Sequence, residues 1–266
     1  MLGNNKVLGT ISPDVAGNTT VGNGFGAATG GNDIIFDWYP MLIPTGACSI
    51  RSISGTIMGS DGAADNGVPF RLYFAKSING VAPSSYGTAH AAQGVNQAAA
   101  FRRNILGALH VTMSSTDDAD NLIAYQVIQS KISTAGSTAG ELRQDIMLEG
   151  EANVTTHGYQ TIYVAMEAQG SAFDFGTDVD LAMAGSAVVD ANMTGASVQI
   201  TVSGTDPRLV FQAGDIIVGE TGTVEAEIVS VDSDTLITLK NISAQIDNAE
   251  QLIHKNPITF NFGLEY

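Results

Sequence analysis

The strongest constraint on the fold is a two-residue alternation of apolar and polar side chains in short segments. In "ITFNFGLEY", residues 258–266, every second residue is apolar: Ile258, Phe260, Phe262, Leu264 and Tyr266. Successive side chains of a strand point to opposite faces, so this period predicts a strand with one buried face. The same period occurs in "PFRLYFAKSI", "NILGALHVTM", "TIYVAMEAQ" and "VDLAMAGSAVV".

Clusters of turn-forming residues separate these segments. Examples are "GSDGAADNG", "SSTDDADN" and "STAGSTAG", whose Gly, Asp, Asn and Ser residues favour tight turns. Many short strands joined by such turns are typical of sandwiches and barrels. The sequence therefore predicts an all-β fold whose body is a jelly roll or β-sandwich.

The alternating segment at 258–266 also predicts the domain organisation. A strand this apolar belongs in the middle of a large core, so it should pair with the body and not with the segment before it. Residues 196–256 then become an inserted small β-barrel with a hairpin tip at 232–234, and the body comprises 33–195 plus 257–266. Insertions are tolerated where the two ends of the inserted unit lie close together.

Two segments lack this alternation. Residues 1–32 are rich in Gly, Asn and Thr, which predicts an extended N-terminal arm that packs on neighbouring subunits and not on its own body. Residues 87–104 are rich in Ala and are interpreted as a long excursion between two strands, with room for one short helix. We expect the wider excursion, 84–104, to take part in an oligomer interface.

The charge balance disfavours nucleic acid as a partner. The 266 residues carry 11 Lys and Arg against 27 Asp and Glu, a net charge of −16, whereas binding to phosphates depends on basic side chains. The same excess disfavours anionic membrane surfaces. We recognise no signal peptide or membrane-spanning segment. A single cysteine, Cys48, is expected to be a buried apolar residue of a chain made in a reducing compartment.

The sequence carries no recognisable catalytic or metal-binding motif. The four histidines, His90, His110, His157 and His254, are far apart in the sequence, and neither GxSxG nor a GxxxxGK[ST] phosphate loop occurs. Two acidic turns could offer oxygens to Ca²⁺ but lack EF-hand spacing, so we interpret them as solvated hairpin tips: Asp61, Asp65 and Asn66, and Asp117, Asp118 and Asp120. The sequence thus predicts no catalytic, cofactor-binding or metal-binding residues, no cofactor and no enzymatic activity.

One stretch carries a resemblance to a known class of proteins. Residues 211–239, "FQAGDIIVGETGTVEAEIVSVDSDTLITL", together with the Gly- and Asn-rich N-terminal segment and strands such as "VPFRLYFAKSI", resemble virion structural proteins of tailed bacteriophages. The resemblance is greatest to head-decoration, or cement, proteins and related appendage proteins. It implies a jelly-roll or β-barrel body, usually trimeric, that sits on capsomers and has no catalytic residues.

The expected function is therefore a non-enzymatic virion structural protein, made in the host cytoplasm, that binds and stabilises the phage head. Its expected partners are the major capsid protein or other virion proteins, and further copies of itself in a homotrimer. Two alternatives stay open. One is a tail, baseplate or fibre-base component. The other is a glycan- or receptor-binding β-sandwich module, which should leave an exposed aromatic platform.

Overall fold

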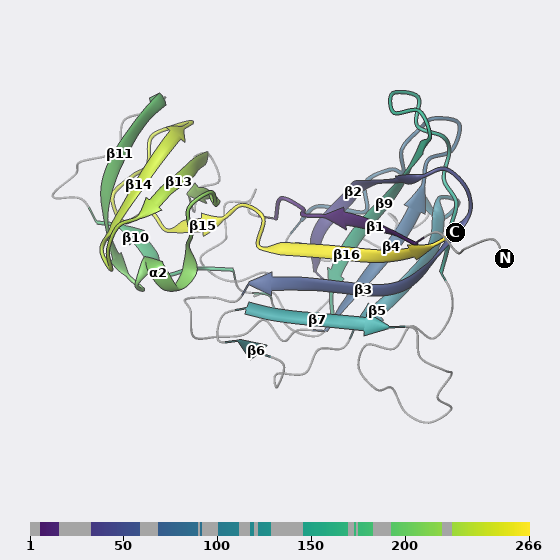
Figure 1. Ribbon diagram of the computed structural model, residues 1–266, viewed down its shortest axis with the longest axis horizontal. Helices are drawn as coiled ribbons and strands as arrows, with labels where there is room; N and C mark the ends of the chain where they lie inside the picture. The colour runs from purple at the N-terminus through teal and green to yellow at the C-terminus, as the bar shows by residue number, and fades with distance from the viewer. Residues whose placement is uncertain are drawn as a thin grey trace.

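The computed structural model of the chain is almost entirely β (Figure 1), which confirms the predicted all-β sandwich with a barrel. It describes residues 6–15, 33–58, 69–89, 91, 101–111, 118–119, 122–128, 146–169, 173, 175–182, 193–219 and 225–266. Most of the excursion at 87–104 lies outside these residues. The acidic turn at 61–66 and residues Asp117 and Asp120 also lie outside them.

Two antiparallel sheets form the body. The first has the order β1-β16-β3-β7-β6, and β8 also pairs with β3. Its strands are β1 (Lys6–Ile11), β16 (Ile258–Glu265), β3 (Cys48–Met58), β7 (Leu122–Ile128), β6 (Asp118–Ala119) and β8 (Met147–Leu148). The second has the order β2-β9-β4-β5, with β2 (Ile34–Pro44), β9 (Tyr159–Ala168), β4 (Phe70–Lys76) and β5 (Ile105–Val111).

The core lies between these two sheets and is built by the alternating residues. Phe70 of β4 contacts Phe260 of β16 at a ring-centroid distance of 5.7 Å, and Phe74 contacts Phe262 at 5.6 Å. The predicted inward residues of β4, β9 and β16 are all buried: Phe70, Leu72, Phe74, Ile162, Val164, Met166, Ile258, Phe260, Phe262 and Leu264. Burial of large side chains stabilises such a core by about 1.5–3 kcal/mol each.

Strand β16 is an inner strand of the first sheet. It pairs with β3 on one side, from Ile258 opposite Ile57 to Glu265 opposite Ser49, and with β1 on the other. The prediction that residues 258–266 pair with the body, and not with the unit that precedes them in the chain, is confirmed.

The prediction that the N-terminal arm does not pack on its own body is wrong for the residues described. Lys6–Ile11 forms β1, in register from Lys6 opposite Glu265 to Ile11 opposite Phe260. Ile11 and Val15 are buried in the body's core. The physical reason is the open edge of β16, whose unpaired backbone groups need a partner strand. Residues 1–5 and 16–32 lie outside the described part.

The barrel is a third antiparallel sheet with its own core. Its order is β10-β11-β14-β13-β12-β15, and a bridge between Asp180 and Gln251 brings the two edges together. Its elements are β10 (Val179–Leu181), β11 (Met193–Gly204), α2 (Pro207–Val210), β12 (Ile216–Gly219), β13 (Glu225–Val231), β14 (Leu236–Ile242) and β15 (Leu252–His254). Within it Ala226 and Ile228 are buried and Glu225 is exposed. The turn at 232–235 joins β13 to β14, which confirms the hairpin tip predicted at 232–234.

The barrel differs from the predicted insertion in its first strand and in its contact with the body. Its sheet begins before residue 196, at β10, because Val179–Leu181 pairs with Val202–Gly204. In addition, Val218 of β12 and Ile253 of β15 belong to the body's core cluster. The barrel is therefore attached through an apolar contact as well as through the chain. In Figure 1 it lies at one end of the body, and the C-terminus lies at the other.

Gly204 closes the β10–β11 edge and cannot be replaced without strain. Its φ is +87°, and a Cβ there would lie 1.9 Å from the carbonyl oxygen of Asp178. That oxygen accepts a hydrogen bond from the amide of Thr205 at 2.8 Å. We expect Gly204→Ala to destabilise the barrel by about 3 kcal/mol, because it adds backbone strain and displaces this hydrogen bond.

Urea unfolding of the Gly204→Ala variant tests this expectation, and Gly214→Ala is the matched control. Gly214 has a φ of +96°, but no atom lies within 4 Å of the position that a Cβ would take there. Its replacement therefore measures backbone strain alone, about 1–2 kcal/mol. Equal losses of stability in the two variants would contradict the role of the Asp178 contact.

Candidate functional site

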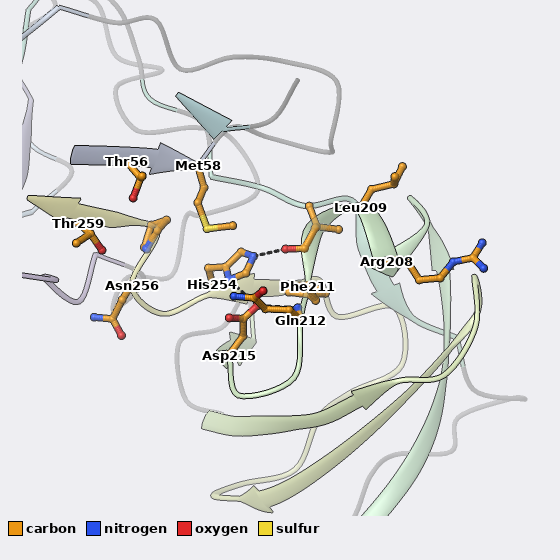
Figure 2. A pocket seen from close by; sticks show the side chains of 12 residues that line it. Thr56, Met58, Arg208, Leu209, Phe211, Gln212, Asp215, His254, Asn256 and Thr259 are labelled. Atoms are coloured by element: carbon orange, nitrogen blue, oxygen red, sulfur yellow. Dashed lines mark hydrogen bonds and ion pairs between the residues drawn. The ribbon is translucent and has the colours of Figure 1, made fainter. Parts of the chain in front are cut away.

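A cavity of about 450 Å³ lies at the junction of the body and the barrel (Figure 2). The body contributes the end of β3 and the start of β16, and the barrel contributes α2, the turn that follows it and the end of β15. The lining residues are Thr56, Met58, Arg208, Leu209, Val210, Phe211, Gln212, Asp215, His254, Asn256, Pro257 and Thr259. This size is in the range of small-molecule sites, and the lining combines apolar side chains with amides, hydroxyls and charged groups.

His254 is the buried polar residue of this cavity, with 6 % of its surface exposed. Its Nε2 lies 2.7 Å from the carbonyl oxygen of Val210 (Figure 2), and its ring packs on Phe211 at 4.7 Å. Because a carbonyl can only accept, Nε2 carries the hydrogen and donates it. Nδ1 faces Asp215 Oδ2 at 3.8 Å, and the same carboxylate oxygen accepts from the amide of Gln212 at 2.8 Å.

Burial lowers the pKa of His254, and the negative charge of Asp215 only partly opposes this effect. The imidazole is therefore neutral at pH 7. Its Nε2–H is committed to a backbone carbonyl, whereas a general base needs a ring nitrogen within reach of the proton that it removes. The geometry gives His254 a structural role: it ties the end of α2 to β15.

The lowered pKa predicts a loss of stability on mild acidification. A group whose pKa is lower in the folded state takes up its proton more readily when unfolded, so stability falls as pH drops below the unfolded value near 6.5. The slope for one proton is at most about 1.4 kcal/mol per pH unit. We expect His254→Gln, which can still donate to Val210, to lose less stability than the parent between pH 7 and pH 5.

Urea unfolding at several pH values measures this difference. His157→Gln is the control, because it removes a histidine that is exposed in the turn before β9 and lies away from the junction, so its pH profile should follow that of the parent. Parallel pH profiles for the parent and His254→Gln would contradict the assignment. Three carboxyls have a pKa that is held low: Glu151, Asp206 and Asp232. Their protonation lowers the stability of the protein only at pH values below this range.

The segment between β15 and β16 connects three parts of the chain. Lys255 Nζ lies 2.6 Å from Glu225 of the barrel and 3.8 Å from Asp14 of the body. The Lys255 carbonyl accepts from the amide of Val15 at 3.3 Å, and Asn256 Nδ2 donates to the Ser12 carbonyl at 2.9 Å. Contacts with residues 12–15 of the body thus hold the junction in addition to the covalent connection.

An aromatic cluster lies on the outer face of the second sheet. Tyr86 and Phe101, near the two ends of the excursion, are both buried there and lie 5.5 and 5.4 Å from the ring of Trp38. The Tyr86 hydroxyl donates to buried Glu167, and burial raises the pKa of Tyr86. These described ends of the excursion are therefore packed on their own body.

The histidines singled out in the sequence lie on separate elements. His110 is exposed on β5, His157 is exposed in the turn before β9, and His254 is buried at the junction; His90 lies outside the described residues. Cys48 is buried, as predicted, with its thiol 3.7 Å from the Leu148 carbonyl. The sequence did not reveal that His254 lies beside Asp215, since the 38 intervening residues carry no spacing signal for it.

A second candidate site is an apolar surface at the end of the body away from the barrel, which we call the distal end. Five large apolar residues are exposed there by 42–90 %: Leu42, Val81, Met147, Val154 and Tyr159. They come from the end of β2, the turn after β4, β8, and the loop and start of β9. The strand registers place these residues at the same end of the sandwich, because Pro44 is opposite Tyr159 and Ser49 is opposite both Met147 and Glu265.

One sequence signal could have located part of this surface. In "PMLIP" the buried residues are Met41 and Ile43, so the alternation places the apolar Leu42 on the outer face. Val81 and Val154 lie in turns, where no period operates.

No group of three metal-binding side chains that could hold an ion occurs among the residues that the structure describes. Across the same ranges no helix has the length and apolarity needed to cross a bilayer. Comparisons of the chain with protein-family models, with curated proteins and with solved structures find no match.

Proposed function

We propose that this chain is a non-enzymatic virion structural protein that decorates and stabilises a phage head. In this proposal it is made in the host cytoplasm, forms a homotrimer and binds the major capsid protein. The resemblance of residues 211–239 to virion proteins motivates the proposal, and the two-part build of the molecule supports it.

The observation that carries the proposal is that the two ends of the molecule expose different kinds of side chain. The body exposes apolar side chains at its distal end, and the barrel attached at the opposite end is acidic. Residues 178–255 contain twelve acidic and three basic residues, a net charge of −9 of the total −16. Contiguous exposed apolar side chains mark contact surfaces, whereas high net charge keeps a surface solvated. Such a molecule has one end suited to protein contact and one suited to projection.

The test is to locate the protein in the particles of the phage that encodes it. Mass spectrometry of purified virions and electron-microscopic reconstruction of their heads should show the chain in regular positions on the capsid lattice. Adding the purified protein to heads that lack it should raise their resistance to heat. Density confined to the tail would support the tail, baseplate or fibre-base alternative, and absence of the protein from particles would overturn the proposal.

A second candidate function, glycan binding, is favoured by one observation. Tyr159 and Tyr163 lie on the outer face of β9, with Thr161 between them, because the alternate residues Ile162 and Val164 enter the core. Aromatic rings on a sheet face can form a sugar-binding platform. A glycan array probed with the parent and with Tyr163→Ala tests this function: binding by the parent that is lost in the variant would support it.

A further inference from the structure

We propose that the cavity at the junction of body and barrel binds a primary alkylammonium ion, whose nitrogen lies between His254 and Asp215. The cavity has a volume of about 450 Å³ and is lined by β3 and β16 of the body and by α2, the turn after it and β15 of the barrel. The inference goes beyond the proposed function and does not depend on it, because it concerns a ligand of the single chain.

The centre of the site is a pair of hydrogen-bond acceptors with no hydrogen between them. His254 donates its Nε2–H to the carbonyl of Val210 at 2.7 Å, so Nδ1 of the neutral ring carries a lone pair and accepts. Oδ2 of Asp215 lies 3.8 Å from this Nδ1, and a carboxylate oxygen also accepts. His254 is buried, and a buried acceptor without a donor is costly. A ligand that donates to both atoms removes this cost.

The distance between the two acceptors favours a nitrogen that carries at least two hydrogens. Because the acceptors are 3.8 Å apart, an atom about 2.9 Å from each of them sees the pair at an angle of roughly 80°. Two hydrogens of an ammonium group point about 110° apart, so both hydrogen bonds depart from linearity by only about 20°. A hydroxyl group has one hydrogen and satisfies one acceptor only.

The charge around the site favours a cation over a neutral donor. Among the residues that the structure describes, no Lys or Arg side chain pairs with Asp215. The basic residue of the lining, Arg208, is paired with Asp206 at 2.6 Å, and its side chain points away from His254 (Figure 2). A largely buried carboxylate is stabilised by a partner of opposite charge. The net charge of −9 on residues 178–255 also attracts cations toward this part of the molecule.

The rest of the lining suits a short alkyl chain. Met58 points from the end of β3 toward His254 (Figure 2), and Phe211 packs on the imidazole at 4.7 Å. The apolar lining comes from both parts of the molecule: Met58, Leu209, Val210, Phe211 and Pro257. Each methylene that a ligand buries against such side chains strengthens binding by about fourfold. A four-carbon chain therefore adds affinity to the contacts of the ammonium group.

The experiment titrates the isotope-labelled full-length protein with n-butylammonium and follows the imidazole nitrogens of its four histidines by nuclear magnetic resonance. The His254 signal is assigned by its absence from His254→Gln. We expect it to shift in a saturable manner, with a Kd on the order of 1 mM, while the other three histidines stay unchanged. n-Butanol lacks the charge and n-butyltrimethylammonium lacks N–H donors, so each should bind at least about tenfold more weakly.

Asp215→Asn removes the charge but keeps an oxygen that can accept from the Gln212 amide. It should weaken binding of n-butylammonium at least about tenfold, because a charge-assisted hydrogen bond is lost. The matched control is Asp247→Asn, which makes the same change of charge at an exposed position of the barrel outside the cavity lining and should bind as the parent does. Fluorescence of Trp38, the single tryptophan, and circular dichroism check that each variant is folded.

The same titration identifies the source of the ammonium group. Equal affinity for n-butylammonium and for Nα-acetyl-lysine methylamide would support the site and indicate a lysine side chain of another protein. Binding of the free amine alone would support it and indicate a small molecule. A His254 signal that does not move, equal binding of the trimethylated ion, or equal affinities of Asp215→Asn and Asp247→Asn would each overturn the inference. None of these results bears on whether the chain occurs in virions, which the particle experiment decides separately.

Discussion

Removing residues 258–266 is expected to abolish the cooperative unfolding of the body. These residues form β16, which lies between β1 and β3 and contributes four fully buried side chains: Ile258, Phe260, Phe262 and Leu264. Losing one large core side chain costs about 2–5 kcal/mol, against a total stability of about 5–15 kcal/mol. The truncated body therefore falls below the threshold for folding.

Two spectroscopic signals separate the body from the barrel in this experiment. Trp38 belongs to the body, so its fluorescence follows the body alone, whereas circular dichroism follows both parts. The truncated chain should show no thermal transition in fluorescence but keep one in circular dichroism, since the barrel has its own core cluster. A fluorescence transition close to the parent's temperature would contradict the requirement for β16 between β1 and β3.

Single substitutions in β16 give a graded form of the same prediction. Phe262→Ala should lower the free energy of unfolding of the body by about 3–5 kcal/mol, because it leaves a cavity beside Phe74. Asn261→Ala is the matched control on the neighbouring residue, whose side chain accepts from exposed Thr10 at 2.8 Å. Its loss should be about 1 kcal/mol or less.

Excising the barrel is expected to leave the body folded, provided that the cut follows the observed sheet. The appropriate excision is 178–251, joined by a bridge of about three Gly residues, because the Thr177 hydroxyl already donates to the Leu252 carbonyl. An excision of 196–256, the range expected from the sequence, would remove the partner of β10 and the Lys255 and Asn256 contacts to residues 12–15.

The excised protein should show one transition in Trp38 fluorescence, with the free energy of unfolding of the body lowered by roughly 2 kcal/mol. That loss corresponds to the contact of Val218 with the body's core, since full burial of such a side chain contributes about 1.5–3 kcal/mol. The excision of 196–256 serves as the comparison and should destabilise the body more. If the 178–251 excision prevents folding, the barrel is an obligatory part of the body and the two-part division is wrong.

The sequence predicted the features that depend on the local alternation of apolar and polar residues. The buried faces of β4, β9 and β16 follow from the two-residue period, and the turn at 232–235 follows from its Asp and Ser residues. Prediction from the sequence failed where contacts with distant segments of the chain determine the structure. In "KVLGTI" the apolar residues Val7, Leu8 and Ile11 do not alternate, and this segment becomes β1 because the edge of β16 is available to pair with it.

The two candidate sites could not be predicted from the sequence for the same reason. The junction cavity joins the end of β3 to α2 and β15, three segments with no common pattern, and its His254–Asp215 contact exists only because β12 pairs with β15. The distal end collects residues from turns and strand ends. Its apolar character depends on which loops meet in three dimensions, and the composition of those loops does not determine this.

The position of β16 has a consequence for biosynthesis. The ribosome makes β1 to β9 first, then the roughly 80 residues of the barrel, and only afterwards the strand that lies between β1 and β3. At translation rates of about 5–20 residues per second this delay amounts to about 4–16 s. During that time the barrel can fold, whereas the nascent body exposes the edges and apolar faces that β16 will cover. The folding of this chain in the cell should therefore depend on chaperones that shield those surfaces.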